Sequence, residues 1–273
     1  MKKLFFTSIF IAAGVASAFS QNINYIDRGA ENKIYGKVKK ITFVNFDSDS
    51  LGNIIGEMPK YKSVEEYDKL GNLKKTYSIN DKGKASVGIL FFYDKLGRLV
   101  ERRQDDSSIL FEYTTKKHIK QYFGNKVLDT EYFLNDSNKV IKKQSYYYIH
   151  NQRIKKRNSD HKYDNKNRLI ECIEYSSNGK IFGRLNREYD ENCYYETYEK
   201  EGHFTKMYIC LDEYGKIIQQ KLIEKNYNEI YESNKNYEIK YFYDENKNWT
   251  KRIYFDETEN SYRTRIRTIE YYK

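Results

Sequence analysis

The stretch YDKLGRL at residues 93–99 decides the fold of this 273-residue chain, because the same pattern returns along it. Copies read YDKLGNL at 67–73, YDNKNRL at 163–169, LDEYGKI at 211–217 and YDENKNW at 243–249. An Asp in this position accepts hydrogen bonds from backbone amides two residues on, and the Gly or Asn after it adopts the positive φ of a tight hairpin turn with a bulge. Each copy therefore predicts a reverse turn. The residues that we expect to build these turns are Tyr67, Asp68, Gly71, Tyr93, Asp94, Gly97, Tyr163, Asp164, Asn167, Asp212, Gly215, Tyr243, Asp244 and Trp249.

Weaker turn signals fill the intervals between these copies. Degenerate copies begin at residues 46–47, 134–136 and 189–190. Steps of roughly nine to fifteen residues between turns are typical of short strands and leave no room for a crossover helix. We therefore predict an all-β fold, an extended antiparallel β-meander of repeated hairpins that forms a twisted or spiral sheet. The predicted turn centres lie near positions 70, 82, 96, 106, 115, 125, 137, 151, 166, 178, 192, 201, 214, 230, 246 and 258.

Apolar and polar residues alternate between the turns, as in strands with one buried face. Tyr and Phe supply much of the apolar set, so the aromatic residues are expected to form most of the core. Three strands show the alternation most clearly. The sets predicted to share a face are Leu73, Tyr77 and Ile79; Leu169, Ile173 and Tyr175; and Trp249, Ile253 and Phe255.

The first residues have the pattern of an export signal. Lys2 and Lys3 precede an apolar run over residues 4–13, and the Ala-Ser-Ala sequence at 16–18 fits signal-peptidase cleavage. The apolar run is shorter than the ~20 residues that a spanning helix needs. We therefore expect residues 1–20 to be a Sec signal peptide and residues 21–273 to form a single domain of repeated hairpins in the periplasm, on the outer surface or outside the cell. About 250 residues fit one elongated domain or two compact ones, and the repeat favours the first.

The composition excludes a disordered chain and a disulfide framework. Mean hydropathy is −0.92, but 29 Tyr and 15 Phe are far more than disordered chains contain. The net charge is +10, or +8 without Lys2 and Lys3, since 47 basic residues then face 39 acidic ones. Dense basic clusters occur at residues 39–40, 142–143 and 155–157. Because Lys and Glu alternate along most strands, we expect a solvated face of mixed charge rather than a polyanion site.

The repeats resemble the YD-repeat, or Rhs-type, family. The resemblance covers the chain from about residue 46 onward and is carried by the copies at 67–73, 93–99, 163–169 and 243–249. It implies a spiralling sheet of hairpins, which in large relatives forms a shell around a toxin or a surface scaffold. This chain is short for a shell, and residues 263–271 still have the pattern of a strand. The closer similarity is to short exported repeat proteins of Bacteroidetes-type bacteria.

Two of the three cysteines are placed for a cross-strand bridge. Cys193 and Cys210 lie symmetrically about the turn at residues 201–202. In a two-residue hairpin they face each other at a non-hydrogen-bonded position, where α-carbons approach to about 4.5 Å. We therefore hypothesise a Cys193–Cys210 disulfide with Cys172 free; the alternative is three half-buried thiols.

No segment has the pattern of a catalytic or metal motif. His118, His150, His161 and His203 lack metal-ligand spacing with another His or Cys. The stretch DSDSLGN at 47–53 is similar to part of a calcium loop, but Met58 stands where the distal Glu is needed, and a repeat turn with extra residues is the favoured interpretation. We expect no catalytic residue, no metal and no cofactor.

Three functions remain open at this point. The favoured one is an exported binding or structural module for an unknown protein or glycan. The alternatives are an exported hydrolase with a carboxylate site, and an anionic-polymer binder, which requires a contiguous basic stripe on one face. No specific nucleic-acid partner is expected. Edge strands at the two ends of an open meander could pair with another chain, so self-association is a further hypothesis.

Overall fold

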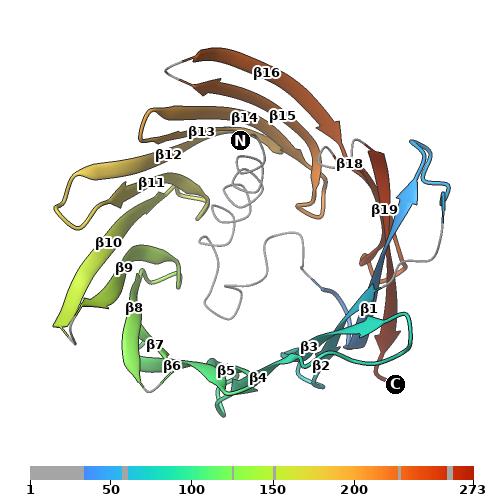
Figure 1. Ribbon diagram of the computed structural model, residues 1–273, viewed down its shortest axis with the longest axis horizontal. Helices are drawn as coiled ribbons and strands as arrows, with labels where there is room; N and C mark the ends of the chain where they lie inside the picture. The colour runs from blue at the N-terminus through green and yellow to red at the C-terminus, as the bar shows by residue number, and fades with distance from the viewer. Residues whose placement is uncertain (1–33, 57–60, 125, 150–151, 227–228, 257–260) are drawn as a thin grey trace. The chain divides into compact units, whose positions relative to one another are not determined.

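The computed structural model is all-β. It describes the whole chain except residues 1–33, 57–60, 125, 150–151, 227–228 and 257–260, so the predicted signal peptide lies outside the described residues. The described residues form nineteen strands and no helix. Consecutive strands pair antiparallel through short turns, which confirms the predicted meander of hairpins (Figure 1). The chain divides into two compact units, and each is described by itself.

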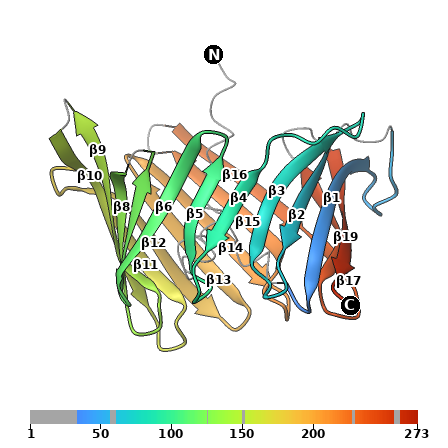
Figure 2. The ribbon, with the colours of Figure 1, turned by 90° about the horizontal axis from the view of Figure 1, so that it is seen from below.

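The first unit contains both ends of the described chain, and we call it the terminal unit. It comprises residues 32–108 and 237–273. Its first strand pairs with its last over ten residue pairs, with Ile41 opposite Ile269, and β2 pairs on the other side of β1 (Figure 2). The first and last strands are therefore not free edges, and the self-association hypothesis loses the edges on which it was based. Its strands, in order across the sheet, are β17 (Lys240–Tyr243), β18 (Trp249–Asp256), β19 (Ser261–Tyr271), β1 (Val38–Ser48), β2 (Tyr61–Tyr67), β3 (Leu73–Asn80), β4 (Ile89–Tyr93) and β5 (Leu99–Gln104).

The second unit, the central unit, spans residues 109–236 of the chain between those two parts. It is a meander in which every strand pairs with the strands before and after it in sequence. Its strands are β6 (Ser107–Thr115), β7 (His118–Phe123), β8 (Val127–Leu134), β9 (Val140–Ile149), β10 (Gln152–Tyr163), β11 (Leu169–Tyr175), β12 (Ile181–Asp190), β13 (Cys193–Lys200), β14 (His203–Leu211), β15 (Ile217–Asn226) and β16 (Glu229–Glu238), the first and last of which cross its boundaries.

The repeat motif folds as one recurrent turn. In the copy at 93–99 the amide of Asp94 donates to the carbonyl of Arg98 at 2.9 Å, and the amide of Gly97 donates to the carbonyl of Asp94 at 3.0 Å. The Asp94 carboxylate accepts the amides of Leu96 and Arg98, both at 2.9 Å. Gly97 has φ +73°, as the turn requires. The same pair of backbone bonds occurs in turns that begin at Asp49, Asp68, Asn80, Asp94, Asn135, Asp164, Ser176, Asp212 and Asp244.

Three details of the predicted turns were wrong. Asp49, not Asp47, is the turn residue of the first degenerate copy, since Asp47 belongs to β1 and its carboxylate pairs with Arg263. The Asp49 carboxylate accepts the amides of Leu51 and Asn53, so the stretch at 47–53 is a repeat turn. At residues 189–190 the strand continues, because Asp190 pairs with Cys193 across a two-residue turn. Position 230 lies within β16 rather than at a turn.

A β-bulge before most repeat turns overturns the predicted faces. The register shifts between Glu66 and Tyr67, and equivalent shifts precede the turns that begin at Asp94, Asn135, Asp164, Ser176, Asp212 and Asp244. Leu73 consequently packs against Ile41 and Tyr67, whereas Tyr77 lies opposite Val64 on the other face. The same shift separates Leu169 from Ile173 and Trp249 from Ile253. Period-two alternation fails there because a bulge inserts one residue on one strand only.

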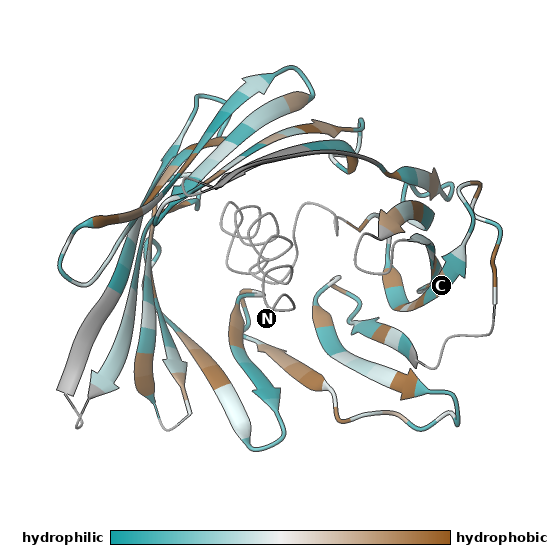
Figure 3. Ribbon diagram, turned by 45° about the horizontal axis from the view of Figure 1, so that its top comes forward, coloured by the Kyte–Doolittle hydropathy of each residue, from teal (hydrophilic) through white to brown (hydrophobic). Residues whose placement is uncertain are grey.

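The bulge turns the repeat tyrosines onto the buried face, where their hydroxyls connect successive copies. The Tyr93 hydroxyl donates to the carbonyl of Leu73 at 3.0 Å, and Tyr163 donates to the carbonyl of Val140 at 2.9 Å. Tyr189 donates to the carbonyl of Leu169 at 3.0 Å. Each acceptor is the first residue of a strand that follows a repeat turn, the turns that begin at Asp68, Asn135 and Asp164. Figure 3, coloured by hydropathy, shows how apolar and polar positions alternate along the strands.

Candidate functional site

Arginines line one face of the terminal unit. Residues directly opposite in neighbouring antiparallel strands share a face. Phe43 of β1 lies opposite Arg267 of β19, and Asn45 lies opposite Arg265. Arg252 of β18 lies opposite Arg265 in turn. We call this the Trp249 face, because the Trp249 ring packs 6.0 Å from the Phe43 ring and 4.7 Å from the Arg267 guanidinium.

The arginines of this face are held by aromatic rings and by polar partners. Both Arg265 and Arg267 place their guanidinium groups near the Phe43 ring, at 6.0 Å and 5.5 Å from its centroid. Arg265 Nε donates to Asn45 Oδ1 at 2.5 Å, and Arg263 pairs with Asp47 at 2.7 Å. Like charges directly opposite each other destabilise a sheet. The pairing of Arg252 with Arg265 therefore concentrates positive charge without stabilising the fold.

A shallow depression of about 300 Å³ lies beside these arginines. Two of its lining residues are aromatic, Phe43 and Tyr77, and both guanidinium groups approach the Phe43 ring. Hydroxyl, amide and carboxylate groups supply the polar part of the lining, and β-branched residues the rest. The lining residues are Phe43, Ser63, Val64, Glu65, Thr76, Tyr77, Ser78, Ser86, Val87, Gly88, Ile89 and Gln104.

The depression lies where the pairing of β3 with β4 is interrupted. Lys75 pairs with Leu90 and Thr76 with Ile89, and pairing resumes at the isolated bridge between Ile79 and Ala85. Gly88 lies at the interruption, where a Cβ would stand 2.2 Å from the Thr76 carbonyl oxygen. Ser86 and Val87, next to it, line the depression, and the Ser86 amide donates to the Ser78 carbonyl at 2.7 Å.

The charge at this site is partly buried. Arg267 is 2% exposed, and its Nε and Nη2 find no hydrogen-bond acceptor among the residues that the structure describes. Burial lowers the pKa of Arg267, and Tyr67 and Glu65 oppose that shift. Glu65 itself accepts a hydrogen bond from the Tyr67 hydroxyl. Each buried donor without an acceptor costs about 1 to 3 kcal/mol. These donors of Arg267 therefore lower the free energy of unfolding.

The central unit has a different polar cluster on one face, which we call the His161 face. Ser159 and His161 of β10 lie opposite Glu174 and Cys172 of β11. Ser159 Oγ is 2.9 Å from His161 Nε2, and Cys172 Sγ is 3.9 Å from the same nitrogen. Lys143 of β9 completes the row, opposite Ser159. The spacing of His161 and Cys172 in the sequence did not indicate that they lie opposite each other on paired strands.

The electrostatics of this cluster oppose nucleophilic catalysis. Burial lowers the pKa of His161 to about 4 and raises the pKa of the Cys172 thiol to about 12. Both shifts favour the neutral forms, whereas a Cys–His nucleophile works as thiolate and imidazolium. Burial also lowers the pKa of Lys143. The row therefore has the properties of a packed polar core.

Further along the central unit, Arg187 and Glu196 form a buried ion pair. Arg187 Nε donates to Glu196 Oε2 at 2.7 Å, with both side chains less than 10% exposed. Burial lowers the pKa of Arg187, but Glu196 together with Tyr194 and Tyr189 raises it by more, so the net shift is upward. The Tyr194 ring lies 5.1 Å from the guanidinium. The two side chains therefore neutralise each other's charge within the fold.

A hydroxyl–imidazole–carboxylate arrangement occurs at the end of the β6–β7 hairpin. Thr114 Oγ1 is 3.0 Å from His118 Nδ1, and His118 Nε2 is 3.1 Å from Glu131 Oε1. The Thr114 hydroxyl also lies 3.1 Å from the His118 carbonyl, to which it can donate its single proton. Glu131 accepts a further bond from the Tyr146 hydroxyl. The imidazole stacks on Phe133 at 4.6 Å, which fits a structural clamp between strands.

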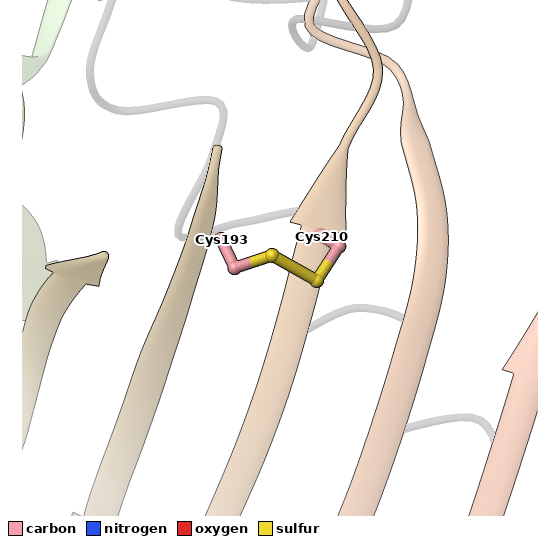
Figure 4. Close-up of a disulfide and its surroundings, with 2 residues drawn as sticks. All are labelled: Cys193 and Cys210. Carbon is pink, nitrogen blue, oxygen red and sulfur yellow. A yellow bond between two sulfur atoms is a disulfide. The ribbon is translucent and has the colours of Figure 1, made fainter. Parts of the chain in front are cut away.

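Cys193 and Cys210 form a disulfide across β13 and β14 (Figure 4). They lie directly opposite each other in the register, with their α-carbons 4.0 Å apart. Cys172 is a free thiol two strands away from β13. Mass spectrometry of the purified protein tests the bridge: we expect two alkylatable thiols to appear on reduction, beside one that is alkylated without it.

Comparison with known proteins assigns no family. No family model matches the chain, and no curated protein matches it. A porin-like protein from Bacteroides uniformis is similar over 87% of this chain and 99% of its own, with 13% identity and a TM-score of 0.49. A porin-like protein from Bacteroides vulgatus covers 73% of this chain at 9% identity and a TM-score of 0.42. The TcdB2-TccC3-Cdc42 structure covers 83% at 11% identity and a TM-score of 0.30, with this chain matching 14% of its length.

These similarities are distant, and at TM-scores below 0.5 they carry no argument about this protein's role. Within the residues that the structure describes, no helix is long and apolar enough to cross a membrane. In the same residues, no group of three or more His, Cys, Asp or Glu side chains is placed to hold a metal ion.

The predicted residues and the observed site barely overlap. The repeat residues all lie in turns or at strand ends, as structural elements. Trp249 contacts the arginine row, with its ring near the guanidinium groups of Arg252 and Arg267. The three predicted basic clusters contribute nothing to that row, which is built from Arg252, Arg263, Arg265 and Arg267. The missed signal was the RTRIR sequence at 263–267, where arginines at alternate positions of a strand must share a face.

Proposed function

We propose that this protein is an exported binding module that holds a glycan at the depression of the Trp249 face. The observation that carries the proposal is the composition of that depression, in which the aromatic residues Phe43 and Tyr77 lie among side-chain hydroxyls, an amide and the Glu65 carboxylate. Aromatic faces stack on sugar rings, and hydroxyl and amide groups match the hydrogen-bonding edges of a sugar.

The rigidity of the site supports this role. Phe43 packs against the cluster of Val38, Ile41, Tyr67 and Leu73, so its ring is fixed before a ligand arrives. Ser63 and Ser78 lie opposite each other on paired strands, which sets their spacing. A site built on strands loses little side-chain freedom on binding.

The depression gives no support to the hydrolase alternative. Glu65 is the one carboxylate among its lining residues. Glycosidases use two carboxyl groups, about 5 to 9.5 Å apart, on either side of the bond that they cleave. The proposal therefore includes binding without catalysis. Export rests on the pattern of residues 1–20, which N-terminal sequencing of the secreted protein tests directly.

The experiment is a glycan-array screen of the mature protein, followed by calorimetry with the best ligand. We expect Phe43→Ala to weaken binding at least about tenfold, as the loss of an aromatic anchor does. The matched control is Phe92→Ala, which removes an aromatic ring from the opposite face of the same unit. Ser63→Trp fills the depression without removing a core residue and should have the same effect as Phe43→Ala. Absence of any glycan ligand, or binding unaffected by both variants, overturns the proposal.

A further inference from the structure

We infer that the depression takes a neutral sugar, and that the Glu65 carboxylate selects it by accepting hydrogen bonds from the sugar's hydroxyl groups. This inference rests on the proposed function, and it specifies the ligand class and the residue that determines it. Its basis is the position of Glu65 on the sheet, together with the charges and hydroxyl groups around it.

Glu65 lies on the face of the sheet that carries Phe43. On β2 it pairs with Thr76 of β3, and Ser63, two residues earlier on the same strand, pairs with Phe43 and with Ser78. Residues that are paired directly, or that lie two apart on one strand, share a face. Glu65 is half-buried and belongs to the lining of the depression. The carboxylate therefore stands among the hydroxyl groups beside the aromatic ring.

One oxygen of the Glu65 carboxylate is already bonded, which fixes the position of the group. Its Oε2 accepts a hydrogen bond from the hydroxyl of Tyr67, a side chain that is 3% exposed. Its Oε1 accepts no hydrogen bond from the residues that the structure describes. Since each carboxylate oxygen has two acceptor sites, the group keeps the capacity to accept hydrogen bonds from a ligand.

The negative charge of Glu65 is offset from within the protein. Glu65 is the one charged side chain among the lining residues. Arg267 is 2% exposed, and burial lowers its pKa, but Glu65 is close enough to oppose this shift. A favourable interaction between two unlike charges acts on both partners. The buried guanidinium therefore offsets the carboxylate, and the depression attracts neither anions nor cations strongly.

This arrangement disfavours charged sugars of either sign. A uronate or a sulfate would bring a negative group next to the Glu65 carboxylate, and like-charge contacts in a partly desolvated site weaken binding. The ammonium group of an amino sugar stacked on Phe43 would meet the guanidinium groups that approach the same ring, those of Arg265 and Arg267. A neutral sugar avoids both contacts. Its hydroxyl groups donate to the carboxylate in charge-assisted hydrogen bonds, which are stronger than neutral ones.

Uncharged partners for the other sugar hydroxyls lie around Glu65. The side chains of Ser63, Thr76 and Gln104 line the depression and make no hydrogen bond to other residues that the structure describes. Hydroxyl and amide groups can donate as well as accept. A sugar ring stacked on Phe43 thus meets one strong acceptor and several groups that bond in either direction. We expect such a site to discriminate sugars by the positions of their hydroxyl groups.

The first test is the charge class of the sugars that the mature protein binds on a glycan array. We expect the best ligands to be neutral. In calorimetry, the best neutral glycan should bind at least about tenfold more tightly than the same glycan with a primary hydroxyl oxidised to a carboxylate. It should also bind more tightly than the analogue in which an amino group replaces one hydroxyl. A uronate or an amino sugar that binds more tightly than its neutral counterpart overturns the inference.

The second test removes the charge of Glu65. Glu65→Gln should weaken binding of the neutral glycan at least about tenfold, since it loses a charged acceptor. It should also reduce the preference for the neutral glycan over its oxidised form to within about threefold, because the charge of Arg267 is no longer offset. A change in charge preference distinguishes a contact with the ligand from a loss of structure.

The matched control is Glu66→Gln, at the next residue of β2. Glu66 accepts a hydrogen bond from the Tyr77 hydroxyl, as Glu65 does from Tyr67, but it lies on the other face of the sheet. The control should leave the affinity for the neutral glycan within about twofold. If Glu65→Gln does not fold, Glu65→Asp retracts the carboxylate by one methylene and keeps its charge. It should weaken binding about fivefold and keep the preference for the neutral glycan.

The outcomes separate this inference from the proposed function. If Phe43→Ala weakens binding of the glycan, while the Glu65 variants keep both its affinity and the charge preference, the role of Glu65 is overturned and the glycan site stands. Absence of any glycan ligand on the array overturns both proposals.

Discussion

The Trp249 face of the terminal unit and the His161 face of the central unit both carry buried polar groups on an antiparallel sheet. The two faces differ in whether those groups have hydrogen-bond partners. On the His161 face, Arg187 is paired with Glu196, and Ser159 bonds His161. On the Trp249 face, Arg267 keeps two donors without acceptors among the described residues, beside a depression of about 300 Å³. The first arrangement stabilises the fold by itself. The second leaves buried donors without acceptors among the described residues, and it is the region in which we propose a ligand site.

Breaking the buried ion pair gives the largest expected effect. Glu196→Ala leaves the Arg187 guanidinium buried without its partner, and we expect a loss of about 3 to 5 kcal/mol in the free energy of unfolding. The control is Glu171→Ala, whose partner Lys162 is mostly exposed, with an expected change of at most about 1 kcal/mol. Urea denaturation followed by tyrosine fluorescence measures both. Equal losses of stability in the two variants would contradict the argument that the buried ion pair stabilises the fold more than the exposed one.

The next largest expected effect is the loss of stability when His161 is protonated, and its sign follows from the lowered pKa of His161. The folded protein lowers the pKa of His161 from 6.5 to about 4, so the unfolded chain binds more protons between those values. The contribution of His161 is fully present above pH 6.5 and is lost as the pH falls to about 4, by up to about 3 kcal/mol. Unfolding midpoints at a series of pH values measure this slope. His161→Gln should flatten it, and an unchanged slope in this variant would contradict the prediction.

The third prediction concerns the opening between β3 and β4. Gly88→Ala would place a methyl group 2.2 Å from the Thr76 carbonyl, and we expect a destabilisation of about 1 to 3 kcal/mol together with weaker ligand binding. Gly83 also lies in the β3–β4 connection, but a Cβ there meets open space, and Asn tolerates its positive φ. Gly83→Asn is therefore the control. Thermal unfolding measures the stability of both variants, and calorimetry measures their ligand binding. Together they decide whether the depression depends on the close approach of Gly88 to Thr76.

The smallest expected effect tests the bonds between successive repeats. Tyr163→Phe removes the hydroxyl that donates to the Val140 carbonyl and should lower stability by about 1 kcal/mol. Tyr195→Phe removes a hydroxyl from an exposed ring and should change stability much less. A Tyr163→Phe protein as stable as the wild type would show that the repeat tyrosines act by packing alone.

The turns could be predicted from sequence because their cause is local. Asp94 and Gly97 contain, within four residues, the acceptor and the positive φ that a reverse turn needs. A bulge was predicted at these turns, but its effect on the faces was missed, because the register shift depends on the partner strand. Leu73 was therefore placed on the face of Tyr77, and Trp249 on the face of Ile253. The depression was missed for the same reason: Phe43, Ser78 and Gln104 come from three strands, and no spacing in one sequence shows that they meet. The arginine row was visible in residues 263–267, but its neighbours on β1 and β18 were not.

The pairing of β1 with β19 also has a consequence for the order of folding. Ile41 and Ile269 face each other although 228 positions separate them along the chain (269 minus 41). Contacts so distant form slowly, because a long loop must close first. Hairpins of the central unit need only neighbouring residues and can form while synthesis continues. The sheet of the terminal unit, which needs both β1 and β19, is thus the last part of the molecule to be completed, and a chain that ends before residue 261 would lack this pairing.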